Sequence, residues 1–279
     1  MEVKTNSMNS WKIVSYILMA IFTLITIGPL LWTFFSSLKP HALIVQSPFK
    51  LFTEWSLANY ISAWKLGEMG ILFLNSMFYS TIATIATVYL ALAAGYGFAK
   101  FGFKISKVLY AFFAAGLLIT VHSVLVPLFV MENWIGIDNT RIGVLIPYIG
   151  FGLPFQIYLA TSFIKSLPTS LEEAARIDGA TFMQVFWKIV IPMAIPVTVT
   201  MLIYAFLGNW NEFVLIMVLT SDSAIRSLPA GINAFAGGMA RNYGFQFAAL
   251  CIGTIPMILF YVAFRKQIAK GFAAGSLKE

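Results

Sequence analysis

The sequence has 279 residues, of which 59% are hydrophobic and only 10% are Asp, Glu, Lys or Arg. Soluble domains carry about 25% charged residues, so this composition predicts a polytopic membrane protein. The net charge is +7, but the basic residues stand singly beside apolar segments and form no stripe with interleaved aromatics. We therefore expect no nucleic-acid partner.

The N-terminal apolar run resembles a signal peptide in its position only. It extends over 13–35, and the following Ser-Ser-Leu-Lys-Pro offers no small-x-small cleavage site. An uncleaved first membrane span is therefore expected. The single cysteine, Cys251, lies in another apolar run, so it is expected to be a packing residue and no intrachain disulfide is possible.

Six stretches have roughly the length that a helix needs to cross a bilayer, about 20 apolar residues. We therefore predict an all-α fold with one transmembrane domain over residues 1–279. The predicted spans are 13–35, 71–94, 108–130, 142–164, 197–220 and 247–264.

The distribution of basic residues predicts the orientation. Six spans place both termini on one side, together with loops 95–107 and 165–196. Twelve of the 18 lysine and arginine residues fall on that side. Since positively charged loops mark the cytoplasm, both termini are expected to be cytoplasmic, in a multi-pass protein of the cytoplasmic membrane.

The loop between spans four and five contains an unusually polar stretch, SLEEAARIDGATFMQVFWKIVIP, at 170–192. Pro168 is expected to end the preceding element, and Ser170 and Glu173 have the spacing of a capping box, which predicts a helix capped by Ser170. Glu172 and Arg176 stand at i and i+4, in the order that favours an ion pair. We expect a short, well-capped helix that needs packing against other elements to be stable.

One face of this helix is thin. Leu171, Ala174, Ala175 and Asp178 share it by the i, i+3, i+4, i+7 rule, so it could fit closely into the groove of a partner. Gly179 is the expected C-terminal stop, and a second capping pair begins the next helix. That pair is Thr181 and Gln184.

A longer sequence pattern in this loop indicates a specific role for it. Glu173-Ala174-Ala175, followed by Gly179 and by Ile-Val-Ile-Pro at 189–192, resembles the EAA loop of ABC-importer permeases. Ile191 replaces the usual leucine of that ending. Further segments are similar to carbohydrate permeases of the maltose-transporter second-subunit type: PLLWTFFSSLKP (29–40), NYISAW (59–64), NS (75–76), AGYGFAKFGF (94–103), GIDNTRIGVLIPYIGFGLPFQIYL (136–159), EEAARIDGAT (172–181), WNEF (210–213) and GFAAGSLK (271–278).

This resemblance implies a type I ABC-importer permease fold, with a cytoplasmic coupling-helix loop at 165–192. It implies that the loop helix docks in a cleft of a cytoplasmic ATPase. It also implies a heterodimer with a second permease, two copies of the ATPase, an extracytoplasmic solute-binding protein and a carbohydrate substrate, in a bacterial or archaeal inner membrane. The residues expected to couple to the ATPase are Glu172, Glu173, Ala174, Ala175, Asp178 and Gly179.

The sequence contains no energy source of its own. The nearest approach to a phosphate-binding loop has Gly97 and Gly102, but Phe103 stands where the lysine should be. No catalytic constellation or cofactor motif is present, so a transport subunit without enzymatic activity is expected, driven by a separate ATPase.

Polar residues within the predicted spans are the candidates for a translocation path. Glu212 lies in predicted span five, with Asn209 and Asn211 nearby. A carboxylate there is costly to bury and faces either a cavity or a packing partner. Both roles stay open for these three residues, whereas Asn75 and Ser76 are expected to form helix–helix hydrogen bonds.

An alternative function is a self-sufficient secondary transporter or channel. That would require a coupling-ion site in discontinuous helices, typically with internal repeats. Glu212 is the one carboxylate inside a predicted span and no convincing repeat relates the two halves, so the importer permease is favoured. A membrane-embedded enzyme has no supporting constellation.

Overall fold

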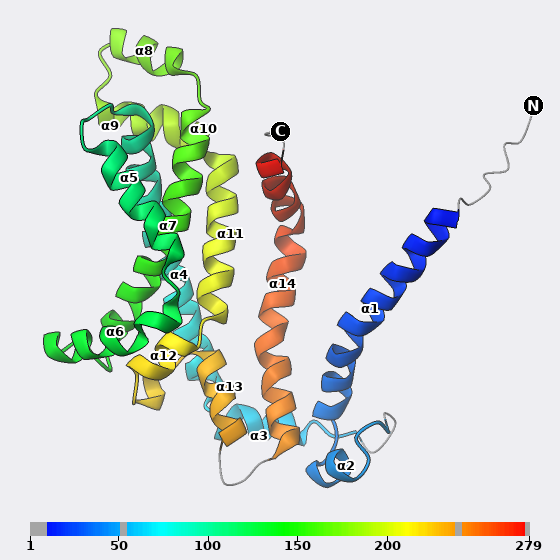
Figure 1. The fold of residues 1–279 in the computed structure, drawn as a ribbon. Helices are drawn as coiled ribbons and strands as arrows, with labels where there is room; N and C mark the ends of the chain where they lie inside the picture. The colour runs from blue at the N-terminus through cyan, green and yellow to red at the C-terminus, as the bar shows by residue number, and fades with distance from the viewer. Residues whose placement is uncertain (1–9, 51–54, 238–241, 277–279) are drawn as a thin grey trace, which may run out of the picture. The chain divides into compact units, whose positions relative to one another are not determined.

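In the computed structural model, which describes residues 10–50, 55–237 and 242–276, every regular element is helical (Figure 1). No strand occurs among these residues, and the predicted all-α fold is confirmed. The described chain forms two compact units, drawn from residues 1–68 with 234–254 and from 69–233 with 255–279. Each unit is described by itself, and the single domain over 1–279 stays a prediction.

In unit 1, hydrogen bonds join the end of the first long helix to Asn59 and Tyr60. The Asn59 amide donates to the carbonyl oxygens of Ser37 (2.8 Å) and Lys39 (2.7 Å), and the Ser37 hydroxyl lies 2.7 Å from that of Tyr60. Two segments singled out in the sequence, PLLWTFFSSLKP and NYISAW, are thus held together. The helices are α1 Ser10–Ser37, α2 His41–Gln46, α3 Ala58–Leu66 and the first part of α14 Tyr243–Ser276.

Unit 2 is a bundle of helices and short helical turns. Its helices are α4 Met69–Lys100, α5 Ser106–Ala115, α6 Val121–Ile135, α7 Arg141–Lys165, α8 Thr169–Ile177, α9 Phe182–Val185, α10 Ile191–Met193, α11 Ile195–Asn211, α12 Val214–Leu219, most of α13 Leu228–Gly237 and the last part of α14. Short helical turns occur at η1 Gly116–Leu118, η2 Phe186–Val190, which is a π-helix, and η3 Ser223–Ile225.

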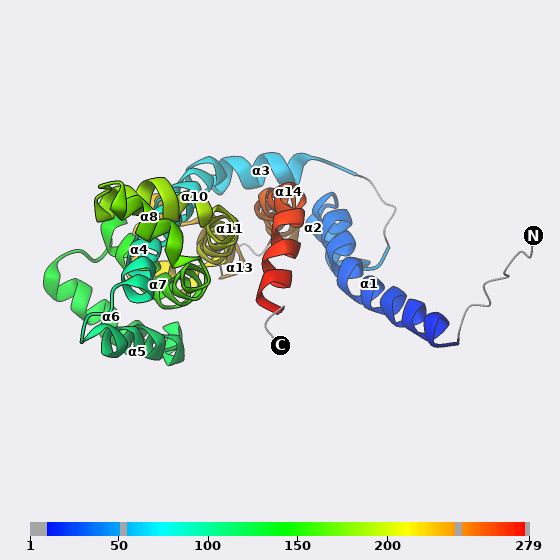
Figure 2. The same cartoon turned by 90° about the horizontal axis from the view of Figure 1, so that it is seen from above.

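The core of unit 2 lies along α4, which packs against both α7 and α11 (Figures 1 and 2). Two buried clusters follow one another along α4. The first joins α4 to α7, η2 and α11 through residues such as Leu92, Ile157 and Met201. The second joins α4 to α7 and α12 through Tyr79 and Tyr148 among others. One side of α4 is therefore buried along most of its length, while side chains such as Leu74 and Ile85 on the other side are exposed.

Among the described residues, four helices are long and apolar enough to cross a membrane by themselves, and two bent pairs raise this to six when each pair counts as one span. The four single helices contain the predicted ranges 13–35, 71–94, 142–164 and 247–264. The second bent pair, Phe182–Met193 with Ile195–Asn211, begins and ends earlier along the chain than the predicted range 197–220.

The other two predicted ranges are not straight helices. Within 108–130 the chain bends by 105° between Ser106–Leu118 and Val121–Ile135. The β-branched residues Ile119 and Thr120 have extended backbones at this bend. Within 197–220, helix α11 ends at Asn211 and α12 begins only at Val214, because Glu212 is extended. Hydropathy does not register such breaks, since the apolar composition continues through them.

The close contact between α4 and α7 leads to a first prediction. Gly95 lies against α7, where a methyl group on it would lie 2.7 Å from the Ala160 Cβ and 3.0 Å from the Thr161 nitrogen. We expect Gly95→Ala to destabilise the protein by about 1–3 kcal/mol through overpacking. Thermal unfolding in detergent, followed by size-exclusion chromatography, measures the effect.

The matched control for that substitution is Gly97→Ala, two residues further along the same helix. A methyl group there has nothing within 4 Å. Gly97→Ala should leave the midpoint of thermal unfolding unchanged or raise it slightly, since alanine favours the helical conformation more than glycine does. Equal midpoints for both variants would show that the α4–α7 contact is not tight at Gly95.

Candidate functional site

The polar helix of the 165–192 loop forms where expected, but it begins differently. Helix α8 spans Thr169–Ile177, its N-cap residue is Pro168 (φ −58°, ψ 128°), and no side chain caps it. The predicted capping box of Ser170 and Glu173 is therefore wrong. Proline, whose φ is fixed near this value, is the N-cap two residues before Ser170, so Ser170 lies inside the first turn.

The C-terminus of α8 is the predicted glycine stop. Gly179 has φ +82°, in the left-handed region that favours glycine. The Ala180 N–H donates to the Ala175 carbonyl (2.9 Å) and the Gly179 N–H to that of Arg176 (3.0 Å). These two bonds form a Schellman motif, which satisfies the last carbonyls of the helix and reverses the chain.

The second capping signal is also confirmed. The Thr181 hydroxyl accepts from the Gln184 N–H (3.3 Å), and the Gln184 side chain accepts from the Thr181 N–H (2.8 Å). The Arg176 guanidinium of α8 lies over the Phe182 ring at 4.1 Å, so α8 and α9 contact each other across the turn.

Glu172 makes a different ion pair from the one predicted. Its Oε1 lies 3.0 Å from the Lys100 Nζ at the end of α4, and both side chains are buried. The Tyr96 hydroxyl donates to its Oε2 at 3.3 Å, and Lys100 also donates to the Leu167 carbonyl at 2.9 Å. Glu172 therefore holds α8 to its own chain instead of pairing with Arg176 along the helix.

The opposite side of α8 is free. Glu173, Ala174 and Asp178 are exposed, Leu171 is 46% exposed and Ile177 is 87% exposed. Of the predicted thin face, only Ala175 packs against the core of unit 2. The exposed face thus combines small, acidic and apolar side chains, and Ile177, which the i, i+3, i+4 pattern omitted, is its most exposed apolar member.

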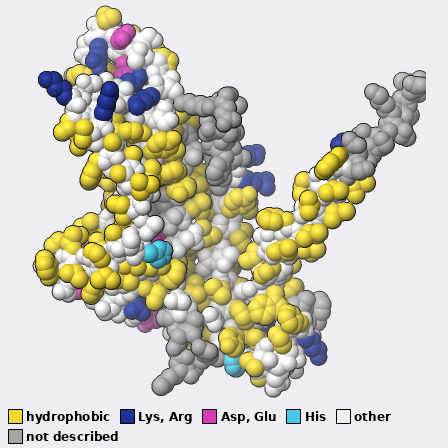
Figure 3. Space-filling model, in the orientation of Figure 1, with side chains coloured by type: hydrophobic (Ala, Val, Ile, Leu, Met, Phe, Trp, Pro, Cys, Tyr) yellow, Lys and Arg dark blue, Asp and Glu magenta, His cyan; other side chains and the backbone are white. Residues whose placement is uncertain are grey.

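Basic side chains gather at the same end of unit 2 (Figure 3). Exposed members at this end are Lys104, Lys107, Lys165, Arg176 and Lys188. These residues come from the two loops, 95–107 and 165–196, that charge counting assigns to one side of the membrane.

From α9 the chain runs through η2 and α10 into α11, with a bend of 77° between Phe182–Met193 and Ile195–Asn211. Pro192 and Pro196 stand on either side of the bend. Phe186 and Val190 of η2 are buried in the core against α4 and α7. The loop is therefore continuous with α11 through packed, helical structure.

The structure gives Glu212 packing partners. Its Oε2 accepts from the Tyr148 hydroxyl of α7 at 3.0 Å, and its Oε1 accepts from the Leu215 N–H at 2.9 Å. The side chain thus caps α12 and ties the α11–α12 break to α7. These contacts account for the carboxylate without a substrate.

Asn209 and Asn211 differ from each other. The Asn209 amide donates to the Thr84 hydroxyl of α4 at 3.2 Å, a helix–helix hydrogen bond. The exposed Asn211 amide donates to the Leu207 carbonyl of its own helix. The three predicted residues are therefore not brought together around one site.

Two buried charged residues were missed by the sequence reasoning. In unit 1 Lys39 is fully buried, with its Nζ 3.4 Å from the Pro48 carbonyl, and burial lowers the pKa of its ammonium. In unit 2 Glu132 is 1% exposed, and neither carboxylate oxygen has a hydrogen-bond partner in the described part of the chain. A local pattern does not reveal such burial, since it depends on distant segments.

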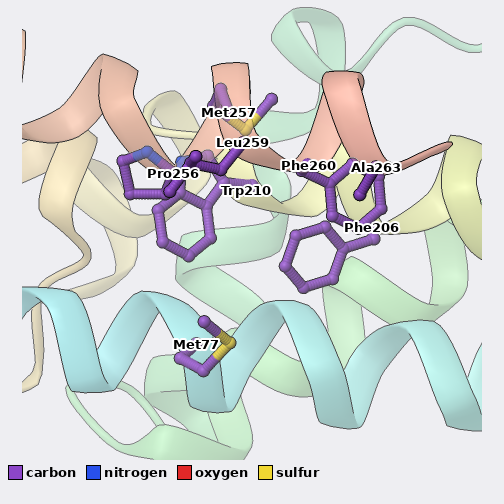
Figure 4. Close-up of a pocket in the computed structure, with 8 residues that line it drawn as sticks. All are labelled: Met77, Phe206, Trp210, Pro256, Met257, Leu259, Phe260 and Ala263. Carbon is purple, nitrogen blue, oxygen red and sulfur yellow. The ribbon is translucent and has the colours of Figure 1, made fainter. Parts of the chain in front are cut away.

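A cavity of about 350 Å³ lies among α4, α11 and α14 within unit 2 (Figure 4). Its lining is apolar, and the indole of Trp210 provides the one N–H among the side chains. Sites for small polar ligands combine an apolar wall with several convergent polar groups, so this cavity lacks the means to orient a sugar. The lining residues are Met77, Phe206, Trp210, Pro256, Met257, Leu259, Phe260 and Ala263.

Residues 87–273 match the family model described as binding-protein-dependent transport system inner membrane component. The chain is 35% identical over 267 residues to the diacetylchitobiose uptake system permease protein NgcG of Streptomyces coelicolor, covering 95% of this chain and 88% of that protein. It is 34% identical over 255 residues to the trehalose transport system permease protein SugB of Mycobacterium tuberculosis, covering 90% and 92%.

The fold also matches a solved structure. A chain of a bacterial ABC transporter involved in the import of the acidic polysaccharide alginate superposes with a TM-score of 0.82 at 22% identity, covering 95% of this chain and 99% of that one. The α-helical architecture, the EAA-type loop and these matches agree. The chain belongs to the binding-protein-dependent transport system inner membrane components, and it is the permease subunit of an ABC importer rather than an enzyme.

Proposed function

We propose that this permease imports a carbohydrate and that the exposed face of α8 is its contact with the ATPase. The observation that carries the proposal is the two-sided construction of α8. Glu172 is buried against Lys100, while Glu173, Ala174 and Ile177 remain exposed. A helix held by one side to its own chain presents the other side in a defined orientation.

The exposed face suits a protein partner. Exposed apolar side chains beside charged ones are typical of interface surfaces, and Ile177 is 87% exposed at the end of the helix. The small side chain of Ala174 allows a partner to approach the backbone of α8. Glu173 and Asp178 offer carboxylates to basic groups of that partner, and Gly179 sets the direction in which the helix ends.

The assembly in this proposal contains a second permease, two copies of an ABC ATPase and an extracytoplasmic binding protein. ATP binding closes the ATPase dimer and draws the two coupling helices together. The permease pair then turns from inward-facing to outward-facing and receives the carbohydrate from the binding protein. Hydrolysis returns the pair to its first state.

In this arrangement both termini and the 165–192 loop lie in the cytoplasm. Support comes from the exposed basic residues at the α8 end of unit 2, because positive charge marks the cytoplasmic side. The substrate class is supported by the relatives, whose names specify diacetylchitobiose and trehalose.

For the three polar residues of the predicted path, the contacts support packing at Asn209 and Glu212. Asn211 is exposed and bonds only within α11 among the described residues, so the translocation-path role is retained for it.

The test of α8 as the ATPase contact is the substitution Ile177→Asp in the complete transporter. If the Ile177 side chain is buried against the ATPase, its replacement by aspartate removes that apolar contact and weakens binding by about tenfold or more. The ATPase should no longer co-purify with the detergent-extracted permease, and ATP-driven uptake should fall accordingly. Glu173→Lys should reduce uptake while the permease remains in the membrane.

Ile105→Asp is the matched control, since Ile105 is 55% exposed in the loop that follows α4. It should leave ATPase recovery unchanged. Full recovery of ATPase with Ile177→Asp, together with normal uptake, would refute the docking role. Loss of Glu173→Lys from the membrane fraction would instead assign that residue a structural role.

A further inference from the structure

The inference begins with the end of α4 that touches α8. Lys100 is the last residue of α4. Its ammonium contacts the Glu172 carboxylate at 3.0 Å and the Leu167 carbonyl at 2.9 Å, so it binds both α8 and the turn before it. The side chains of Lys100 and Glu172 are only 6% and 8% exposed. A buried pair of this kind resists separation, because each charge would be left without its partner.

Aromatic contacts support the same junction. The Tyr96 hydroxyl donates to Glu172, and its ring lies 5.4 Å from that of Phe186 in η2. Phe101, directly after α4, packs edge-on against Phe182 of α9 at 5.1 Å. Movement of α8 therefore acts on the end of α4 through space, in addition to acting on α11 along the chain.

Helix α4 is suited to carry such a movement. It has 32 residues without a proline, which corresponds to a length of about 48 Å. The long helices α1, α7 and α14 each contain a proline. One side of α4 packs against α7 and α11 in the first core cluster and against α7 and α12 in the second. Since no proline interrupts its backbone hydrogen bonds, α4 has no proline kink that would absorb a displacement of one end.

The opposite end of α4 holds a second segment, residues 224–228. The Asn75 amide donates to the carbonyls of Ala224 (2.7 Å) and Arg226 (3.0 Å). The Tyr79 hydroxyl donates to the Ile225 carbonyl at 2.8 Å, and the Ser76 hydroxyl accepts from the Leu228 N–H at 2.7 Å. Three side chains of α4 thus satisfy successive backbone groups of one loop.

From these contacts we infer that α4 transmits the movement of α8 to the 224–228 segment, with Lys100 as the positioning residue at the α8 end. This inference rests on the proposed role of α8 at the ATPase. It adds a second coupling route, through Lys100 and α4, to the route along the chain through Gly179 and α11.

The experiment measures whether the 224–228 segment responds to ATP. Cys251 is the only cysteine, so Cys251→Ala provides a background in which the exposed Ser223 is replaced by cysteine. Membranes containing the complete transporter are treated with a maleimide, with and without ATP, and the labelling rate of the residue-223 thiol is compared. ATPase retained on the membranes is measured in the same samples.

In the parent we expect ATP to change the labelling rate. Lys100→Met and Glu172→Gln should reduce that change about tenfold, which is within the usual range for coupling between two sites. The charge exchange Lys100→Glu with Glu172→Lys should restore part of it. Lys104→Met, at an exposed lysine in the following loop, should leave it intact.

Tyr79→Phe provides a test that does not disturb a buried charge. It removes only the hydroxyl that binds Ile225, so it should reduce the ATP-dependent change without loss of protein from the membrane. A full ATP-dependent change in both Lys100→Met and Tyr79→Phe would overturn the inference while the proposed function stands. Absence of both ATPase binding and an ATP response in the parent would overturn the proposed function, and the inference with it.

Discussion

Substitution of Gly179 by valine is expected to stop ATP-driven uptake while the permease remains in the membrane. Gly179 has φ +82°, a conformation that costs a non-glycine residue about 1–3 kcal/mol and is least accessible to β-branched side chains. The strain would be released by changing the direction in which α8 leaves its turn. We expect uptake to decrease in the order Gly, Asn, Ala, Val, because asparagine tolerates the left-handed region.

The order of the variants separates backbone strain from loss of space. A side chain at Gly179 has nothing within 4 Å in the described structure, so bulk by itself has no effect within the chain. Uptake of labelled substrate by cells, normalised to the amount of permease in the membrane, is the measurement. Better uptake with alanine than with asparagine would indicate that the partner's surface restricts the size of residue 179. Normal uptake with valine would refute the coupling role of this turn.

Substitution of Glu212 by alanine is expected to lower the stability of the permease by about 1–3 kcal/mol, the usual cost of removing hydrogen bonds to a charged group. It removes the acceptor of both the Tyr148 hydroxyl and the Leu215 N–H. Glu212→Gln keeps an acceptor at this position and should be nearly as stable as the parent. Tyr148→Phe removes one of the two bonds and should give an intermediate midpoint in thermal unfolding.

The same variants discriminate packing from substrate contact. If Glu212 acts through packing, Glu212→Gln should leave the KM for uptake unchanged. A raised KM in Glu212→Gln, with an unchanged unfolding midpoint, would instead place the carboxylate on the translocation path.

Local features of the site were predictable from the sequence. The glycine stop at Gly179 and the capping pair of Thr181 and Gln184 depend on residues only a few positions apart, so their chemistry is visible in the sequence. Apolar length likewise predicted where the long helices lie. The capping box at Ser170 failed because Pro168 had already started the helix.

The partners of the buried charges were not predictable. Glu172 had a favourable neighbour in Arg176, and an isolated helix would use it. In the folded chain Lys100 arrives from α4 and binds Glu172 in a buried site, while Arg176 lies over Phe182. Burial strengthens an ion pair and penalises an unpaired charge, so the contact from a distant segment replaces the local one.

The sequence by itself determined that the chain is an α-helical membrane protein, which segments are apolar, and which loop resembles the EAA loop. These properties depend on composition, spacing and short-range capping, which need no tertiary contact. Only the tertiary structure decided where the apolar segments bend, which face of α8 is free, and what Glu212 and Lys100 touch. Those outcomes depend on which distant segments pack together, and burial then changes the energy of every polar group involved.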